Sequence, residues 1–127
     1  MKYKLKKFTS IFIGSLLFIG CFDLLDLAYW KDGNYRLSTN AGDPSCLALT
    51  NEGIMLLECV KSIGSNKKYI IATQIDNQGK TWYWLIKKEK SKYDEKPKGP
   101  FDLSQFSKIK TVTGISELQF ERSFQKN

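Results

Sequence analysis

The chain has 127 residues, of which 20 are Lys or Arg and 13 are Asp or Glu, so its formal net charge is +7. This length corresponds to a single domain. The chain contains no histidine, which excludes Ser-His-Asp and Cys-His catalysis, histidine-ligated zinc and an imidazole pH switch.

The first 20 residues predict an export signal. Residues 1–7 carry four lysines and no acid, and residues 8–20 are an uncharged, mainly apolar run. A basic start followed by a short apolar run and a small residue is the pattern of a secretory signal peptide. As a helix this run would span about 20 Å, less than the hydrocarbon core of a bilayer at about 30 Å. An ordinary cleaved signal and an uncleaved anchor are the alternatives to the interpretation that follows.

The end of the apolar run, Leu17-Phe18-Ile19-Gly20-Cys21, resembles the lipobox of bacterial lipoproteins. It departs from the usual pattern at Phe18, where a smaller aliphatic residue is commoner. The resemblance implies a signal peptide over residues 1–20 and fatty acyl chains, palmitate among them, on Cys21. Two or three such chains hold a soluble domain at a bilayer surface. We therefore expect an exported protein on the outer face of the cytoplasmic membrane or in the outer membrane.

Removal of residues 1–20 changes the charge of the chain. Four lysines and no acid are lost, so the net charge falls from +7 to +3. Residues 87–98 hold six lysines and three acids, so the rest of the mature chain is balanced. Arg36 and Arg122 are its only arginines, and nothing indicates a nucleic-acid-binding face.

The mature chain is expected to have a lipidated cysteine and tether at residues 21–34 and one domain at residues 35–127. Short β-branched and aromatic runs alternate with turn residues at intervals of about ten residues, which is typical of an antiparallel meander. The candidate strands are residues 35–39, 46–50, 54–62, 68–75 and 81–88.

The C-terminal part predicts a loop, a helix and a last strand. Residues 87–100 are rich in Lys and Pro and are expected to form an exposed loop. Asp102 with Gln105 three residues later predicts a capping box at the start of a helix, and Gly114 can end that helix. Residues 117–124 alternate in the manner of a strand. The expected fold is therefore mainly β (α+β): a small antiparallel meander of about six strands, with one short C-terminal helix before the last strand.

Three short motifs resemble a family of small uncharacterised bacterial lipoproteins. They are KYIIATQ at residues 68–74, WYWLI at residues 82–86 and GPF at residues 99–101. The similarity covers roughly residues 54–120. It implies a small mainly-β domain beneath a lipoprotein signal, and it carries no known activity and no functional residues.

Cys46 and Cys59 remain once Cys21 is assigned to lipid. An even pair in an exported protein is a candidate disulfide. If the loop between their strands is Glu52-Gly53, Cys46 lies opposite Cys59. If the loop also includes the residue before Glu52, the two thiols face opposite sides of the sheet. The longer loop is favoured because Glu52 disfavours a positive φ. The sequence therefore does not decide whether the two cysteines form a disulfide.

The segment Trp82-Tyr83-Trp84 could form the core or a platform for a sugar or peptide. In a strand Trp82 and Trp84 share one face and Tyr83 takes the other. A domain of this size needs large apolar side chains for its core, which favours packing, with Tyr83 expected to be the exposed member.

Candidate surface contacts are Tyr83 and four lysines of the segment that follows. The lysines are expected to solubilise the protein and protect a sheet edge, with contact to anionic lipid or an acidic partner as the alternative. These lysines are Lys87, Lys88, Lys90 and Lys92.

The carboxylates offer no catalytic pair. Asp94 and Glu95 are expected in the solvated loop, and Glu58 is the acid expected to be partly buried. No phosphate-binding loop motif occurs. We therefore expect no enzymatic activity, no metal and no cofactor.

The predicted function is that of a lipid-anchored extracytoplasmic module that binds another molecule without catalysis. The alternative is an inhibitor or immunity-type protein that blocks a cognate toxin or envelope hydrolase. The expected partners are the membrane, through the lipid on Cys21, and another protein, with no nucleic acid and the oligomeric state left open.

Overall fold

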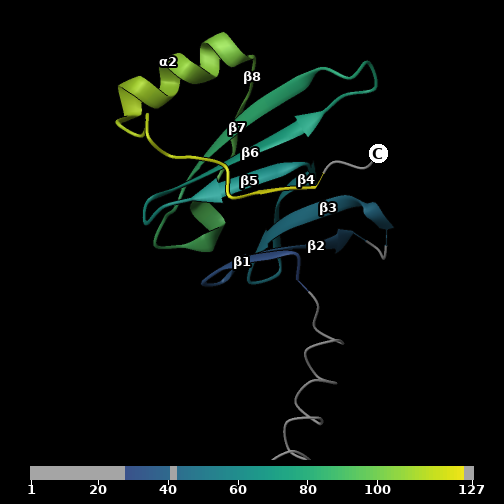
Figure 1. The fold of residues 1–127 in the computed structure, drawn as a ribbon. Helices are drawn as coiled ribbons and strands as arrows, with labels where there is room; N and C mark the ends of the chain where they lie inside the picture. The colour runs from purple at the N-terminus through teal and green to yellow at the C-terminus, as the bar shows by residue number, and fades with distance from the viewer. Residues whose placement is uncertain (1–27, 41–42, 125–127) are drawn as a thin grey trace, which may run out of the picture.

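The computed structural model describes residues 28–40 and 43–124, which form two antiparallel sheets and a helix (Figure 1). One sheet has the strand order β1-β2-β3-β4 and the other the order β8-β7-β6-β5-β9. The first sheet comprises β1 (Trp30–Asp32), β2 (Tyr35–Asn40), β3 (Asp43–Asn51) and β4 (Ile54–Val60). The second comprises β5 (Ser62–Ser65), β6 (Tyr69–Ile75), β7 (Thr81–Lys87), β8 (Lys98–Phe101) and β9 (Arg122–Ser123). A short 3₁₀ helix (Lys92–Asp94) and α2 (Leu103–Thr113) complete the fold.

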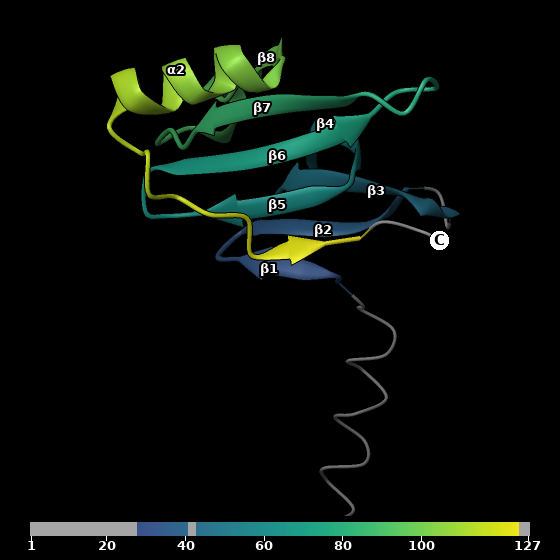
Figure 2. The same cartoon turned by 45° about the horizontal axis from the view of Figure 1, so that its top comes forward.

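The molecule has three layers, with the five-stranded sheet between the four-stranded sheet and α2 (Figure 2). Successive side chains of β6 and β7 point to opposite faces of the middle sheet, so each strand contributes to both cores. Ile70 and Ile86 belong to the core between the sheets, whereas Ile71 and Leu85 belong to the core beneath α2. The mainly-β fold with a helix before the last strand is therefore confirmed.

The β6–β7 hairpin pairs without interruption from Tyr69↔Lys87 to Ile75↔Thr81. Its turn is closed by Asp76, whose Oδ1 accepts hydrogen bonds from the backbone N–H groups of Gln78 and Lys80, each at 2.9 Å. Such local side-chain contacts are what make Asp a turn residue, and the predicted hairpin is confirmed.

The described residues contain nine strands rather than about six. The single strand expected over residues 54–62 is two, β4 and β5, in different sheets. Cys59 has a φ of +50°, and just beyond it the Lys61 N–H donates to the Thr73 carbonyl of β6 at 2.8 Å. The chain thus bends out of the first sheet and into the second within a few residues, which β-bulges allow.

The first sheet begins with β1, inside the segment expected to be a tether. Trp30 pairs with Leu37 and is only 6% exposed, so it is a core residue.

The strand expected over residues 117–124 is reduced to β9. The chain before β9 passes close over Gly64 of β5, where an added Cβ would clash with the Gln119 carbonyl oxygen and lie 3.0 Å from the Phe120 Cα. The backbone leaves no room for a side chain at residue 64, which is why a glycine stands inside this strand.

α2 begins and ends as predicted. Asp102 accepts a hydrogen bond from the Gln105 N–H at 2.8 Å, and the Gln105 side chain accepts one from the Asp102 N–H at 2.9 Å. Gly114 ends the helix with a φ of +82°. The helix buries Phe106 against the middle sheet.

Candidate functional site

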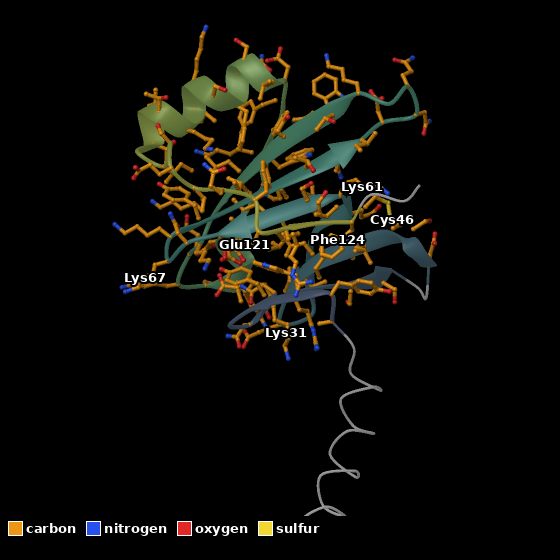
Figure 3. The ribbon with its side chains drawn as sticks, in the orientation of Figure 1. Lys31, Cys46, Lys61, Lys67, Glu121 and Phe124 are labelled. Carbon is orange, nitrogen blue, oxygen red and sulfur yellow. A yellow bond between two sulfur atoms is a disulfide. The ribbon has the colours of Figure 1, made fainter. Side chains whose placement is uncertain are left out.

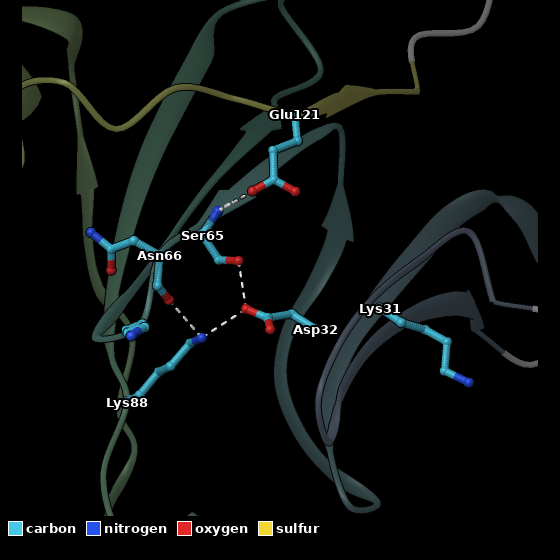
Figure 4. Close-up of a pocket in the computed structure, with 7 residues that line it drawn as sticks. Lys31, Asp32, Ser65, Asn66, Lys88 and Glu121 are labelled. Atoms are coloured by element: carbon cyan, nitrogen blue, oxygen red, sulfur yellow. Dashed lines mark hydrogen bonds and ion pairs between the residues drawn. The ribbon is translucent and has the colours of Figure 1, made fainter.

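A polar cleft lies where β1 of the first sheet meets β5 and the turn that follows it (Figure 4). Its cavity has a volume of about 380 Å³. Figure 4 shows the side chains of Asp32, Ser65 and Lys88 converging in the cleft, whereas Lys31 is directed away from them. The lining residues are Lys31, Asp32, Ser65, Asn66, Lys67, Lys88 and Glu121.

Asp32 is the centre of the cleft. Its Oδ2 accepts hydrogen bonds from the Lys88 ammonium at 2.7 Å and from the Ser65 hydroxyl at 2.6 Å. The same Lys88 ammonium donates to the Asn66 carbonyl at 2.7 Å. The Lys88 hydrogen bond, followed by that of Ser65, holds the pKa of Asp32 below its usual range. A carboxylate stabilised in this way is a weaker base.

Glu121 closes the other side of the cleft. Its two carboxylate oxygens accept hydrogen bonds from the Trp30 indole N–H at 3.1 Å and from the Ser65 backbone N–H at 3.0 Å. Because Trp30 is in β1 and Ser65 in β5, this one side chain joins the two sheets.

A second polar cluster surrounds Glu95, which is 6% exposed. The Tyr35 hydroxyl donates to Oε2, the Asn51 side-chain amide to Oε1 at 2.6 Å, and the Glu89 N–H to Oε2 at 3.0 Å. The expectation that Glu95 lies in a solvated loop is therefore wrong, because three protein donors replace water around its carboxylate. Burial, and then the hydrogen bond to Glu95, raises the pKa of Tyr35 above its ordinary value.

The four candidate lysines do not act alike. Lys88 turns inward to Asp32, and its ammonium also lies 5.2 Å from the centre of the Tyr35 ring. Lys92 pairs with Glu52 at 3.5 Å. Lys87 and Lys90 are exposed. Two of the four lysines therefore form ion pairs with the rest of the domain, and the segment is not one continuous exposed basic patch.

Tyr83 is partly buried beneath α2, and the expectation that it is exposed is not met. Its ring stacks on Phe106 with 4.8 Å between ring centres and lies 6.3 Å from Phe120. The reason is that α2 covers this face of β7.

The two tryptophans of the same strand are fixed by hydrogen bonds. The Trp82 indole N–H donates to Asp76 at 3.0 Å and that of Trp84 to Gln74 at 2.8 Å. Trp84 packs against the core between the sheets, in agreement with the favoured core interpretation.

Cys46 and Cys59 form a disulfide with 4.1 Å between their Cα atoms. The loop has two residues, because Asn51 pairs with Ile54. The preference for a longer loop is therefore wrong: Glu52 adopts a φ of +49° and Gly53 one of +89°, the pair of positive values that a two-residue hairpin turn needs.

The register between β3 and β4 shifts twice before the bridge, at Leu49↔Leu57 and Leu47↔Val60. Cys59 therefore reaches Cys46 from an irregular part of β4 rather than from a regular cross-strand position. Glu58, the acid expected to be partly buried, is exposed.

Several polar residues of these clusters carried no signal in the sequence. The sequence around Asp32, Lys31-Asp32-Gly33-Asn34, indicates only a turn, and Glu95 is expected only as part of a charged loop. Apart from the Glu89 N–H, which is six residues from Glu95, their partners are 33 to 60 residues away in the chain, beyond the reach of any local pattern.

Cys21, the predicted lipidation site, lies outside the described residues. Within residues 28–40 and 43–124 no group of three or more Cys, Asp or Glu side chains could hold a metal ion. In the same ranges no helix has the length and apolar character needed to cross a bilayer. No family model matches the chain, and neither do curated proteins or solved structures. The resemblance to small lipoproteins therefore stays a prediction.

Proposed function

We propose that the chain is an exported lipoprotein, anchored through Cys21, whose β domain binds another molecule outside the cytoplasm without catalysis. The observation that carries this proposal is the distribution of the three cysteines. Cys46 and Cys59 are joined to each other, which leaves Cys21 as the one cysteine without a partner in the chain. It directly follows the apolar segment that resembles a lipoprotein signal.

The disulfide supports the export part of the proposal. Disulfides form and persist in oxidising compartments outside the cytosol. The bridge closes a loop of about 15 residues and stabilises the fold by roughly 3 kcal/mol. A small domain facing an extracytoplasmic environment gains from such a cross-link.

The polar cleft supports a binding rather than a catalytic role. Two of its charged groups are partners of each other: Lys88 pairs with Asp32, and Ser65 donates to the same carboxylate. The lowered pKa of Asp32 makes its carboxylate a weaker base toward that hydroxyl. The arrangement stabilises the junction of the sheets and leaves surface contact as the mode of action.

The proposal is tested by feeding cells that express the full chain a fatty acid that can be labelled. We expect the wild-type chain to incorporate the label and Cys21→Ser to lose it. Cys46→Ser is the matched control, because it also removes one thiol but should keep the label. Labelling of the Cys21→Ser chain, or an unlabelled wild type, would contradict lipidation at Cys21.

The binding role is tested by crosslinking the anchored protein in intact envelopes and identifying its partners by mass spectrometry. Recovery of a single toxin or envelope hydrolase, inhibited by the purified chain, would replace the general binding role with that of an inhibitor. Absence of any crosslinked partner would contradict the binding role.

A further inference from the structure

The position of β1 sets the orientation of the domain if the proposed lipid anchor holds, and the following inference rests on that anchor. β1 lies on the side of the molecule opposite α2 (Figure 2). The described chain starts at Ala28, just before β1. Seven residue steps separate Cys21 from Ala28, and a fully extended chain covers at most about 25 Å in that distance. A lipid on Cys21 therefore keeps β1 within about 25 Å of the bilayer, whereas α2 lies on the opposite side of the domain.

The β1 side carries exposed lysines that form no ion pair with any of the described acids. Lys31 and Lys67 line the same cleft, and Figure 3 places both in the half of the molecule that contains β1. Lys68 follows Lys67 in the turn between β5 and β6, and all three residues are exposed. Within the described residues none of the three forms an ion pair.

The acids near these lysines are mostly engaged. Asp32 pairs with Lys88 at 2.7 Å, and Glu52 pairs with Lys92 at 3.5 Å. Glu121 remains as the one unpaired carboxylate among the residues that line the cleft. Among the described residues, Lys31, Lys67 and Lys68 therefore outweigh the negative charge of Glu121 at this cleft.

We propose that Lys31, Lys67 and Lys68 form a basic rim that docks on the phosphate groups of anionic lipids. An anionic membrane surface attracts each nearby lysine enough to raise binding about fivefold, so three together contribute about a hundredfold. The lysine ammonium is a compact point charge on a flexible stem, so it contacts headgroup phosphates without a preformed pocket. The rim adds a second membrane contact to the acyl chains and fixes which side of the domain faces the bilayer.

The α2 side does not offer the bilayer a continuous apolar surface. Its exposed apolar residues, Leu103 and Val112, are nine positions apart, which is about 180° around a helix. They therefore lie on opposite flanks rather than on one apolar face. Between them the outer surface carries Lys108 and three exposed hydroxyl residues, Ser104, Ser107 and Thr111.

The first test measures the chemical modification of lysines in the full chain, isolated from membranes and reconstituted in vesicles. One preparation contains phosphatidylcholine alone, and the other contains phosphatidylcholine and phosphatidylglycerol in roughly equal parts. We expect Lys31, Lys67 and Lys68 to react at least about threefold more slowly in the anionic vesicles. Lys108 on α2 should react equally in both and serves as the internal control.

Two results of this footprint would overturn the rim. They are protection of Lys108 instead of the rim, and equal reactivity of the rim in both preparations.

A second test separates the rim from the anchor, because it uses full chains that also carry Cys21→Ser. One chain has Lys31→Glu, Lys67→Glu and Lys68→Glu, and the control has the same number of reversals at lysines away from β1. We expect binding to anionic vesicles to fall at least about tenfold more for the rim variant than for the control. An equal loss in both would show that net charge alone matters and would overturn the rim. The control reversals are Lys80→Glu, Lys98→Glu and Lys108→Glu.

Failure of the rim and failure of the anchor give different results. If Cys21 carries no lipid but the rim variant still loses binding, the proposed anchor is wrong and the rim stands. If Cys21 carries lipid but the two charge variants behave alike, the anchor stands and the rim is wrong.

Discussion

The two faces of the five-stranded sheet are held by different kinds of contact. The face beneath α2 is joined by apolar and aromatic packing around Phe106 and Tyr83. The other face packs on the first sheet through an apolar core. At its edge near β1, however, the two sheets are joined by the polar contacts of Asp32 and Glu95. The α2 side is therefore stabilised by the burial of apolar side chains. The position of β1, by contrast, depends on a few charged groups.

The difference matters for function because these polar contacts lie on the side where the chain enters the domain. Contacts of Asp32 and Glu121 tie β1 to β5. In an anchored protein these contacts join the tether to the body of the domain. The α2 side is stabilised independently and faces away from β1.

The largest expected effect is on the α2 side, from Phe106→Ala. This side chain is 3% exposed and stacks on Tyr83, so its removal creates a cavity. We expect the free energy of unfolding to fall by about 3–5 kcal/mol, measured by urea denaturation. Val112→Ala is the control on the same helix, because Val112 is 85% exposed, and should change stability by less than about 0.5 kcal/mol. Equal losses of unfolding free energy in Phe106→Ala and Val112→Ala would contradict the claim that burial stabilises the α2 side.

The next effect concerns the first sheet, through its disulfide. Replacing both Cys46 and Cys59 by Ser should lower the free energy of unfolding by about 3 kcal/mol, since the unfolded chain regains the freedom of the closed loop. Urea denaturation of the oxidised wild type and of the double variant measures it. Reduction of the wild type should give the same loss, and a reduced protein as stable as the oxidised one would count against this account.

A smaller effect is expected at the Glu95 cluster. Tyr35→Phe removes one of the three donors to the buried carboxylate and should cost about 1–2 kcal/mol at neutral pH. The raised pKa of Tyr35 gives the sign of the pH dependence: the folded state keeps the phenol proton when the unfolded chain has lost it. The wild type should therefore lose stability as the pH rises above 10, its ordinary value.

The control for this alkaline loss is Tyr93→Phe, because Tyr93 is 71% exposed. Thermal midpoints at several pH values should show the loss in the wild type and in Tyr93→Phe but a weaker one in Tyr35→Phe. An identical alkaline profile for all three proteins would remove the assigned role of Tyr35.

The smallest effect is expected from Asp32→Asn in the cleft. The carboxylate is partly open to solvent, with 36% of its side chain exposed, so screening limits the cost to about 0.5–1 kcal/mol. Because the pKa of Asp32 is lowered from 3.8, its contribution is present above that pH and is lost as the pH falls below it. The gap between wild type and variant in thermal midpoint should close in acid, and a gap that widens in acid would contradict the assigned pairing.

The two sides also differ in how far the sequence predicts them. The start of α2 follows from Asp102 and Gln105, which are three residues apart and bond to each other. The β6–β7 hairpin follows from a turn that Asp76 closes within four residues. Such features are local, so a pattern in the sequence records them.

The junction near β1 could not be predicted, because its contacts join distant parts of the chain. Asp32 meets Ser65 and Lys88, which are 33 and 56 residues away. The two register shifts in β3–β4 and the positive φ of Cys59 have no local signature either. The disulfide between Cys46 and Cys59 is a candidate from the sequence because an even cysteine pair in an exported protein meets an oxidising compartment. The structure contains this disulfide although the hairpin is irregular.

The mass of the intact protein isolated from cell membranes tests the account most directly. The account predicts a chain that begins at Cys21, carries the added mass of a diacylglyceryl group, and gains two protons when the Cys46–Cys59 bridge is reduced. A chain that begins at Met1, or a Cys21 without lipid, would contradict the anchored orientation from which the membrane-facing role of β1 is derived.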